Sequence, residues 1–260
     1  MAEPLKTGAF TVSIVSHGQA ELCARLLDDL ARHSAASIGQ LIITQNVPDS
    51  VPVTLDLPFP VEVIDNPRPQ GFGENHNKAF RRATGDFFAV MNPDLRIPGD
   101  PFPALARCLA DPTVGIAAPL VREASGTVAD FARPLVSPWE VLRRRVDARV
   151  DPSQLARPDW IAGMFLAFRR QAYADLGGFD ERYFLYCEDV DICARVRLRG
   201  LRLEMAGDAS VTHLAQRESR RSLRYMWLHV SSLFRFWSSP VYRDYRALLR
   251  SEAAGLAGGR

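Results

Sequence analysis

The chain has 260 residues, 47% of them hydrophobic, and a formal net charge of only +2. This length suits one large or two small domains with a substantial core, and the near-neutral charge argues against a nucleic-acid partner. The four scattered cysteines form no Cys-x-x-Cys pair, which argues against a zinc site or disulfide framework and favours a reducing, cytoplasmic location. No signal-peptide pattern opens the chain, and no apolar run approaches the ~20 residues of a membrane span.

Strands and helices alternate along the first third of the chain. Short apolar runs predict strands at 10–15, 40–44, 61–64 and 87–91, and helical spacing predicts helices at 19–33 and 75–84. This order is typical of an α/β domain with an open, mostly parallel sheet and helices on its faces. Such sheets bind ligands at the carboxyl ends of their strands. The candidate contacts are therefore Ser16, His17, Asn46, Asn66 and the segment after residue 91.

The glycine-rich run 70–78 lies between the third and fourth predicted strands. Gly71 and Gly73 would let the backbone approach a ligand closely, and Asn75 and Asn77 offer side-chain amides at the start of a helix. The spacing matches neither a dinucleotide fingerprint nor a Walker loop. A glycine turn followed by an asparagine helix cap is the alternative.

The segment Asn92-Pro93-Asp94 directly follows the fourth predicted strand. It brings a carboxylate to the edge of the sheet, where Asp94 would bind Mg²⁺ or Mn²⁺ if a phosphate supplied further oxygen ligands. An ordinary Asn-Pro-Asp turn is the alternative, because these residues commonly open loops.

The stretch 180–200 is the best candidate for the chemistry. It holds five carboxylates, and Glu188, Asp189 and Asp191 fall within four residues between apolar neighbours. The pattern indicates a loop that runs into a helix at 189–199. Acidic residues favour a helix N-terminus, so a capped helix is one interpretation. The other is a general base, whose pKa burial and neighbouring carboxylates would raise toward working pH.

The remaining segments connect or extend these parts. Residues 121–157 are rich in Arg and Pro, with a short helical stretch at 143–145, and are expected to join the two halves of the domain. Residues 160–168 predict one buried strand that begins at Trp160, which would stack on a sugar or isoprenoid or simply fill core. Residues 253–260 are expected to form a disordered tail.

Residues 222–237 predict an amphipathic helix with an apolar stripe among several arginines. A basic helix with aromatic residues can lie on an anionic membrane surface. Packing against the catalytic domain or in a homodimer is the alternative for the same stripe.

Together these motifs resemble inverting glycosyltransferases of family 2 with the GT-A fold, and most of all the rhamnosyltransferase-like branch that builds bacterial surface polysaccharides such as O-antigen. The resemblance rests on the order and spacing of segments 11–16, 71–77, 85–94, 160–170 and 177–195. It implies a single Rossmann-like GT-A domain at 1–214, with a donor half at about 1–120 and an acceptor half at about 158–214. Residues 215–260 would form a C-terminal helical extension and tail.

The resemblance also implies a metal-dependent, inverting transfer. A sugar, with rhamnose as one candidate, would move from a nucleotide-diphosphate donor to a hydroxyl of a glycan or lipid-linked glycan. The enzyme would be cytoplasmic, or peripheral at the cytoplasmic face of the inner membrane. The first rival is a sugar nucleotidyltransferase, for which the turn after the first strand is a poor match. The second is a non-catalytic glycan-binding or scaffold subunit that retains the fold.

Residue roles follow from the same resemblance. Asp94 would hold Mn²⁺ or Mg²⁺ on the donor diphosphate, His213 would complete the metal site, and Asp189 would be the base. Glu188 and Trp160 would contact the acceptor, with Glu188 also able to orient Asp189. The donor pocket would be lined by Ser16, Asn46, Gly71, Phe72, Asn77, Asn92 and Asp94. The chain departs from the family pattern at His17-Gly18 and Gln45-Asn46, which leaves the donor base open.

Overall fold

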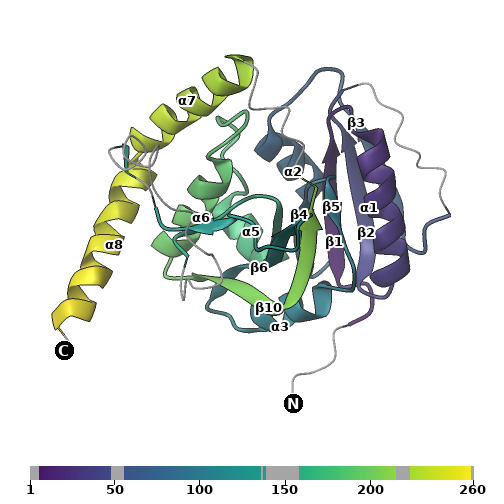
Figure 1. Ribbon diagram of the computed structural model, residues 1–260, viewed down its shortest axis with the longest axis horizontal. Helices are drawn as coiled ribbons and strands as arrows, with labels where there is room; N and C mark the ends of the chain where they lie inside the picture. Colours follow the sequence, from purple (N-terminus) through teal and green to yellow (C-terminus); the bar gives the residue numbers. More distant parts are fainter. Residues whose placement is uncertain (1–5, 48–55, 136, 139–157, 215–222, 259–260) are drawn as a thin grey trace.

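The computed structural model describes residues 6–47, 56–135, 137–138, 158–214 and 223–258. An eight-stranded sheet forms the centre of the molecule, in the order β3-β2-β1-β4-β9-β6-β10-β5 (Figure 1). Its strands are β1 (Phe10–Ser16), β2 (Ile38–Gln45), β3 (Val61–Asp65), β4 (Phe87–Met91), β5 (Leu95–Arg96), β6 (Val114–Glu123), β9 (Phe165–Arg169) and β10 (Arg202–His213). A second, two-stranded sheet pairs β7 (Ala132–Arg133) with β8 (Trp160–Ile161).

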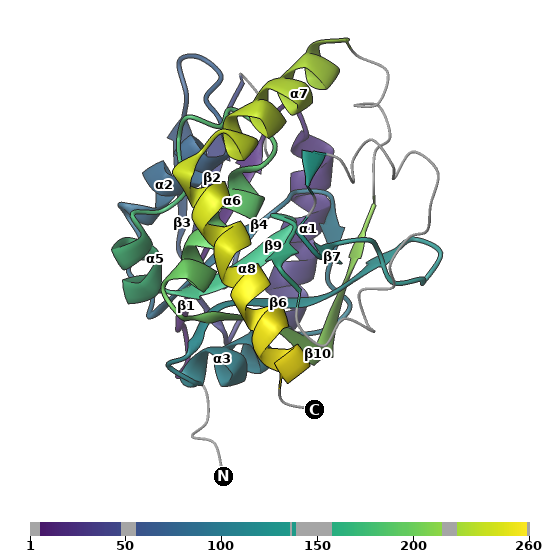
Figure 2. The same cartoon turned by 90° about the vertical axis from the view of Figure 1, so that its left-hand side faces the viewer.

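The helices lie on both faces and along one side of the sheet (Figures 1 and 2). They are α1 (Ala20–His33), α2 (Phe72–Phe80), α3 (Phe102–Ala110), α5 (Arg170–Leu176), α6 (Glu188–Leu198), α7 (Leu223–Trp237) and α8 (Pro240–Gly258). The apolar spacing of α1 buries Leu26, Leu27 and Leu30 against the sheet, as its period requires. The expected α/β architecture is confirmed.

The sheet is parallel in the first half and mixed in the second. Strands β3, β2, β1 and β4 are all parallel to their neighbours, as the alternation of strands and helices predicts. In contrast, β9 runs antiparallel to both β4 and β6, while β10 runs parallel to β6. The short β5 crosses to the far edge and pairs antiparallel with β10. This crossing brings the end of β10 beside the segment that follows β4.

The run 160–168 is not one strand, and that prediction is wrong. It divides into β8 and β9, and residues 162–164 between them bond to other segments. Ala162 N donates to Phe131 O at 2.7 Å, and Met164 O accepts from Asn92 N at 2.9 Å. The glycine at 163 interrupts the apolar run, and glycine inside a strand pattern often marks such a break.

Two helices have boundaries that differ from the predictions by several residues. Helix α2 spans Phe72–Phe80 rather than 75–84. The expected disordered tail at 253–260 is wrong as far as residue 258, because α8 continues to Gly258. This helix is docked by Tyr245, whose hydroxyl donates to Asp159 O at 2.7 Å, and by a 2.7 Å ion pair between Arg197 and Glu252.

Two predictions fall on or beside residues that the structure does not describe. The helical stretch expected at 143–145 lies outside the described residues. The domain boundary at 214/215 also falls where the described residues stop, and it stays a prediction. In the described part of the chain, no helix combines the length and apolar character needed to cross a membrane.

Candidate active site

Asp94 and His213 meet at the carboxyl edge of the sheet. Because β5 pairs with β10 in the register Leu95 with His213, the residue before β5 lies beside the end of β10. His213 Nε2 is 3.0 Å from Asp94 Oδ2, and both side chains are largely buried. The other carboxylate oxygen, Asp94 Oδ1, is buried and has no hydrogen-bond partner among the described residues. Buried polar atoms are normally paired, so this oxygen is available to a ligand.

This pair has the composition of an incomplete metal site. A carboxylate oxygen and an imidazole nitrogen both coordinate Mn²⁺, and carboxylates also coordinate Mg²⁺. Within the described residues, no group of three or more His, Cys, Asp or Glu side chains is positioned to hold a metal ion. The two side chains therefore fit a cation whose remaining ligands come from another molecule, such as a diphosphate.

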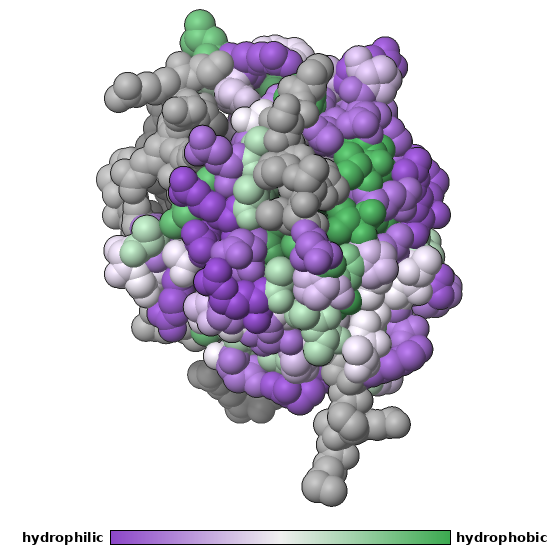
Figure 3. All heavy atoms as spheres, turned by 90° about the vertical axis from the view of Figure 1, so that its right-hand side faces the viewer, coloured by the Kyte–Doolittle hydropathy of each residue, from purple (hydrophilic) through white to green (hydrophobic). Residues whose placement is uncertain are grey.

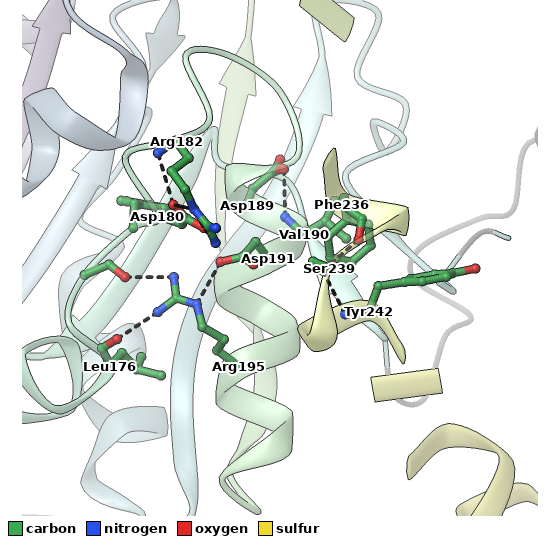
Figure 4. Close-up of polar contacts among 12 residues, drawn as sticks. Leu176, Asp180, Arg182, Asp189, Val190, Asp191, Arg195, Phe236, Ser239 and Tyr242 are labelled. Atoms are coloured by element: carbon green, nitrogen blue, oxygen red, sulfur yellow. Dashed lines mark hydrogen bonds and ion pairs between the residues drawn. The ribbon is translucent and has the colours of Figure 1, made fainter. Parts of the chain in front are cut away.

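Glu188 and Asp189 begin α6. Asp189 Oδ2 accepts a hydrogen bond from Gly163 N at 3.0 Å. Asp189 Oδ1 accepts one from Val190 N at 2.8 Å, which Figure 4 shows. Burial raises the pKa of Asp189, although these two N–H donors and the charge of Arg133 oppose the rise. The result is an oriented carboxylate that holds a proton more tightly than an ordinary aspartate.

Glu188 is more deeply buried than Asp189 and less well satisfied. Burial and the neighbouring charge of Asp189 raise the pKa of Glu188 well above its usual range. Its Oε2 atom is buried without a hydrogen-bond partner in the described part of the chain. Two adjacent carboxylates with raised pKa values are typical of a functional site rather than of helix capping alone.

Asp191, the third carboxylate of the cluster, is structural. Arg195 Nε donates to Asp191 Oδ2 at 2.7 Å, and the same guanidinium donates to Leu176 O and Gly178 O at 2.8 Å each. Figure 4 shows Asp191 and Asp189 pointing to different sides of the first turn of α6. The Asp191–Arg195 pair therefore anchors α6 to the glycine turn after α5.

The loop that enters α6 is strained. Tyr186 and Cys187 have φ values of 72° and 67°, a left-handed conformation that costs a non-glycine residue about 1–3 kcal/mol. Two helices hold this loop from opposite directions. From α2, Phe72 N donates to Phe184 O at 2.8 Å; from α7, Ser232 Oγ donates to Leu185 O at 2.8 Å. The carboxylates are thus presented by a conformation that other elements maintain.

The predicted donor-side residues do lie at neighbouring strand ends. Ser16 is buried at the end of β1, where its carbonyl accepts from Asn46 N at 2.8 Å. Asn46 clasps Gln70 through two bonds: its Oδ1 accepts from Gln70 N at 2.7 Å, and its Nδ2 donates to Gln70 O at 2.9 Å. Asn66 Nδ2 also donates to Asn46 Oδ1 at 2.9 Å. These side chains fix the loop before α2.

Asn77 faces the segment 173–181. Its Oδ1 accepts from the Tyr173 hydroxyl at 2.7 Å and from Phe179 N at 2.9 Å. Its Nδ2 donates to Phe179 O at 2.9 Å and to Glu181 Oε1 at 3.0 Å. The full hydrogen-bonding capacity of the amide is used. A nucleotide contact by Asn77 stays a prediction that would require one of these bonds to break.

The glycines of the run 70–78 pack closely against residues 179–184 of the same protein. A Cβ atom on Gly71 would lie 3.0 Å from Tyr183 O, and one on Gly73 would lie 2.5 Å from Phe179 Cβ. Small residues are needed here because α2 packs closely against the segment that leads to α6. The Phe72 ring packs edge-on against Phe179. A Cβ on Gly163 would lie 3.5 Å from this ring and from Asp189 Cβ.

Trp160 lies in β8. Its Nε1 donates to Pro134 O at 3.2 Å, and the Arg133 guanidinium stands 5.5 Å from its ring centroid. Arg133 and Gly163 are two residues of the site that the sequence analysis missed. The glycine that interrupts an apolar run was a usable signal for Gly163. No sequence signal distinguished Arg133 from the other arginines.

Residues 162–164 join the two parts of the site. On one side, Met164 O accepts from Asn92 N, two residues before Asp94. On the other side, Gly163 N donates to Asp189 Oδ2. The candidate metal ligands and the candidate base are therefore linked through adjacent residues of a single connecting segment.

Comparison with known proteins shows which family this chain belongs to. The profile of a family described as "Glycosyltransferase like family 2" matches residues 8–235. An N-acetylglucosaminyl-diphospho-decaprenol L-rhamnosyltransferase of Mycobacterium tuberculosis (strain ATCC 25618 / H37Rv) is 26% identical over 94% of this chain and 89% of the relative. Rhamnosyltransferase WbbL of Escherichia coli (strain K12) is 26% identical over 86% of this chain and 91% of the relative.

Solved structures share the fold. The mannosyltransferase PcManGT from Pyrobaculum calidifontis, solved with GDP-Man and Mn²⁺, matches with a TM-score of 0.62 at 17% identity, over 95% of this chain and 75% of that one. GalNAc-T7, solved with UDP, GalNAc and Mn²⁺, matches with a TM-score of 0.61 at 17% identity, over 80% of this chain and 43% of that one. These neighbours confirm the GT-A fold expected from the sequence.

Proposed function

Because the chain belongs to the family 2-like glycosyltransferases and is therefore a glycosyltransferase, we propose that it is a metal-dependent, inverting enzyme. It moves a sugar from a nucleotide-diphosphate donor to a hydroxyl of a glycan or lipid-linked glycan. The observation that carries the proposal is the pairing of two half-satisfied sites across residues 162–164. Asp94 and His213 lie on one side, and Glu188 and Asp189 lie on the other.

The donor side would hold the leaving group. Asp94 and His213 would bind Mn²⁺ or Mg²⁺, which when bound neutralises the charge that develops on the departing diphosphate. Asp94 contributes its unpartnered Oδ1 atom to this site. Ser16, Gly71, Phe72 and Asn92 remain the proposed donor contacts. The rigid Asn46–Gln70 clasp maintains the shape of the pocket next to them.

Asp189 would be the general base. Its carboxylate is aimed by Gly163 N and Val190 N, and its raised pKa improves its ability to accept the proton of the acceptor hydroxyl near neutral pH. As the hydroxyl oxygen bonds to the anomeric carbon, the bond to the diphosphate breaks and the proton passes to Asp189. One displacement with one base inverts the anomeric centre, so no carboxylate nucleophile is required.

Glu188 and Trp160 would position the acceptor. The buried, unpartnered Glu188 Oε2 atom can bond to an acceptor hydroxyl, and the half-buried Trp160 ring offers a flat apolar surface for a sugar. The M. tuberculosis relative is named for transfer of L-rhamnose to a diphospho-decaprenol acceptor. We therefore take rhamnose and a lipid-linked glycan as the first donor sugar and acceptor to test, at the cytoplasmic face of the membrane.

A thermal-shift screen tests the donor side. Nucleotide diphosphates and nucleotide sugars are screened with and without Mn²⁺, because a ligand that binds the folded state raises Tm by mass action. We expect one donor to give a Mn²⁺-dependent rise that Asp94→Ala abolishes. Asp86→Ala is the matched control, since Asp86 is an exposed carboxylate at the opposite end of β4.

The screen has a clear contrary outcome. If no nucleotide raises the Tm of the folded protein under any condition, the proposed donor side is wrong. If a donor binds equally well without metal and in Asp94→Ala, the proposed donor binding stands but the proposed metal site does not.

A further inference from the structure

One face of α7 is apolar and uncovered. Seven large apolar side chains are exposed among the described residues, and five of them lie on this helix. They are Leu223, Met226, Trp227, Val230 and Phe234, with exposed fractions from 46% to 78%. Their spacing of three, four and seven residues places them on a single helical face, which we call the α7 apolar face. The buried Ser232 and Phe236 face the protein instead.

The α7 apolar face continues into an arginine-lined pocket. Phe234 stacks edge-on with Trp237 at 6.4 Å, and Trp237 lines an open pocket of about 520 Å³ where α7 meets α8. Arg243, Arg246 and Arg250 project into the same pocket from one side of α8. Figure 2 shows α7 and α8 following one another down this side of the molecule, with a bend where they meet. Apolar and cationic groups are therefore contiguous here.

The charge of α7 is one-sided, and around the neighbouring pocket the three arginines of α8 outnumber Asp244, which is ion-paired with Arg243. Helix α7 carries Arg224 and Arg235 and no acidic residue, and the sequence 217–221 before it adds three arginines and a single glutamate. A second copy of the chain docking through the same face would bring arginines against arginines. An anionic lipid surface is complementary to both parts, because it offers phosphates to the arginines and acyl chains to the apolar side chains.

We propose that the α7 apolar face and the arginine pocket dock this protein on an anionic phospholipid bilayer. Trp227, Phe234 and their neighbours enter the boundary between headgroups and acyl chains, and Arg243 and Arg250 bind lipid phosphates. Figure 3 shows the opposite side of the molecule, where hydrophilic residues predominate and apolar patches lie between them.

Docking would place the acceptor side of the site next to the membrane, a consequence that rests on the proposed function. The inner side of α7 holds the strained loop before Glu188: Ser232 Oγ donates to Leu185 O, and the His229 ring packs on Tyr186 at 4.9 Å. A hydroxyl acceptor carried on a lipid would then reach the carboxylates from the bilayer surface without leaving it.

Vesicle sedimentation of the full chain, without nucleotide sugar, tests the docking. Phosphatidylcholine vesicles with and without phosphatidylglycerol are compared. We expect binding to the anionic vesicles, and a roughly tenfold or greater loss of binding in the double variant Leu223→Glu/Phe234→Glu. Arg25→Glu is the control, because it changes the net charge by the same amount at an exposed position of α1. It should bind like the wild type.

The pocket is tested separately by charge removal. Arg243→Gln/Arg250→Gln should weaken binding to anionic vesicles by roughly thirtyfold, at about 1 kcal/mol for each arginine near the surface. The matched control Arg25→Gln/Arg32→Gln removes two exposed arginines from α1 and should leave binding unchanged. If both double variants lost vesicle binding equally, the pocket would have no specific role in docking, because the loss would reflect only the change in net charge.

Other outcomes overturn the whole proposal. The proposal is wrong if the folded wild-type protein stays in the supernatant with both vesicle types. It is also wrong if Leu223→Glu/Phe234→Glu still binds anionic vesicles like the wild type. A dimer in sedimentation velocity that this variant converts to monomer, with no vesicle binding, would assign the face to a second copy of the chain. Because no donor is present, failure here is distinct from failure of sugar transfer.

Discussion

The asparagines behind the donor pocket and the carboxylates of the site are both buried polar groups, but they use their hydrogen-bonding capacity differently. Asn46 and Asn77 are bonded to other parts of the chain through both their amide oxygen and their amide nitrogen. Asp94 and Glu188 each retain a buried oxygen without a partner in the described residues. Six other buried side-chain atoms of the described residues also lack a partner, but Asp94 and Glu188 are the two carboxylates among the eight. An unpaired buried carboxylate oxygen costs more than an unpaired neutral group, so we take these two to indicate where a ligand completes the structure.

This difference separates scaffold from chemistry. The asparagines fix the loop before α2 and join α2 to the segment 173–181, so replacing them should mainly lower the stability of the fold. The carboxylates are held in place but keep unused hydrogen-bonding capacity, so replacing them should mainly reduce ligand binding and turnover. Four predictions test this division, starting with the largest effect.

Asp189→Asn should nearly abolish transfer. The amide keeps the shape of the carboxylate but cannot take the acceptor proton, and a positioned base contributes about 10²- to 10⁴-fold to rate. We expect kcat to fall by that factor while donor affinity, measured by thermal shift, stays the same. Asp175→Asn, an exposed aspartate on α5, is the control and should match the wild type. If Asp189→Asn kept full turnover, Asp189 would not be the base and Glu188 would be the next candidate.

His213→Ala should weaken the metal site without removing it. Even if His213 acts only as the hydrogen-bond partner of Asp94, losing such a partner typically costs 10- to 100-fold in metal affinity. The Mn²⁺ concentration that gives half-maximal activity should rise by roughly that factor. His33→Ala, at the end of α1, is the control. An unchanged Mn²⁺ requirement would leave Asp94 as the sole protein ligand among the described residues.

Asn77→Ala should destabilise the protein and spare donor binding. The substitution leaves the Tyr173 hydroxyl and Phe179 N–H buried without an acceptor, at a cost of about 1–3 kcal/mol for each group. Denaturant unfolding would show the loss, while the donor-induced rise in Tm persists. Asn92→Ala is the informative contrast, since a donor contact predicts the reverse pattern. If Asn77→Ala lost donor affinity at unchanged stability, Asn77 would be a ligand residue after all.

The first four strands were the part that the sequence predicted well. Four short apolar runs gave β1 to β4 within one or two residues, because buried parallel strands leave a continuous apolar signal. Asp94 and His213 were paired only through the family resemblance. Their contact depends on β5 crossing to β10, which no local pattern shows.

The asparagines show why the rest was hard to predict. Asn77 has the same sequence signal whether its amide faces a nucleotide or Phe179, and Phe179 lies 102 residues away. His76, from the same motif, is a core residue: burial lowers its pKa to about 3, and it bonds to Ser13. Residue type and local spacing identify a polar group, but only the fold decides whether another segment satisfies it.

Glu188→Gln should give the smallest effect and the most specific one. In the folded protein the pKa of Glu188 is raised by burial and by Asp189, so the folded state binds this proton more tightly than the unfolded state. Its contribution to stability is therefore complete at low pH and is lost as pH rises through the raised pKa. At pH 8 the wild type bears the cost of either keeping a proton that the unfolded chain releases or carrying a buried charge, and the glutamine bears neither cost.

The variant should therefore melt higher than the wild type at pH 8, with the difference shrinking toward pH 4. Each kcal/mol of difference corresponds to about 2–4 °C in Tm for a chain of this size. Calorimetry across this range measures the effect, and Glu21→Gln on exposed α1 should show none. A Tm that drops equally at every pH would mean that Glu188 is held by bonds like those of Asn77. The carboxylate would then belong with the scaffold, and the unpartnered oxygen would not mark a ligand site.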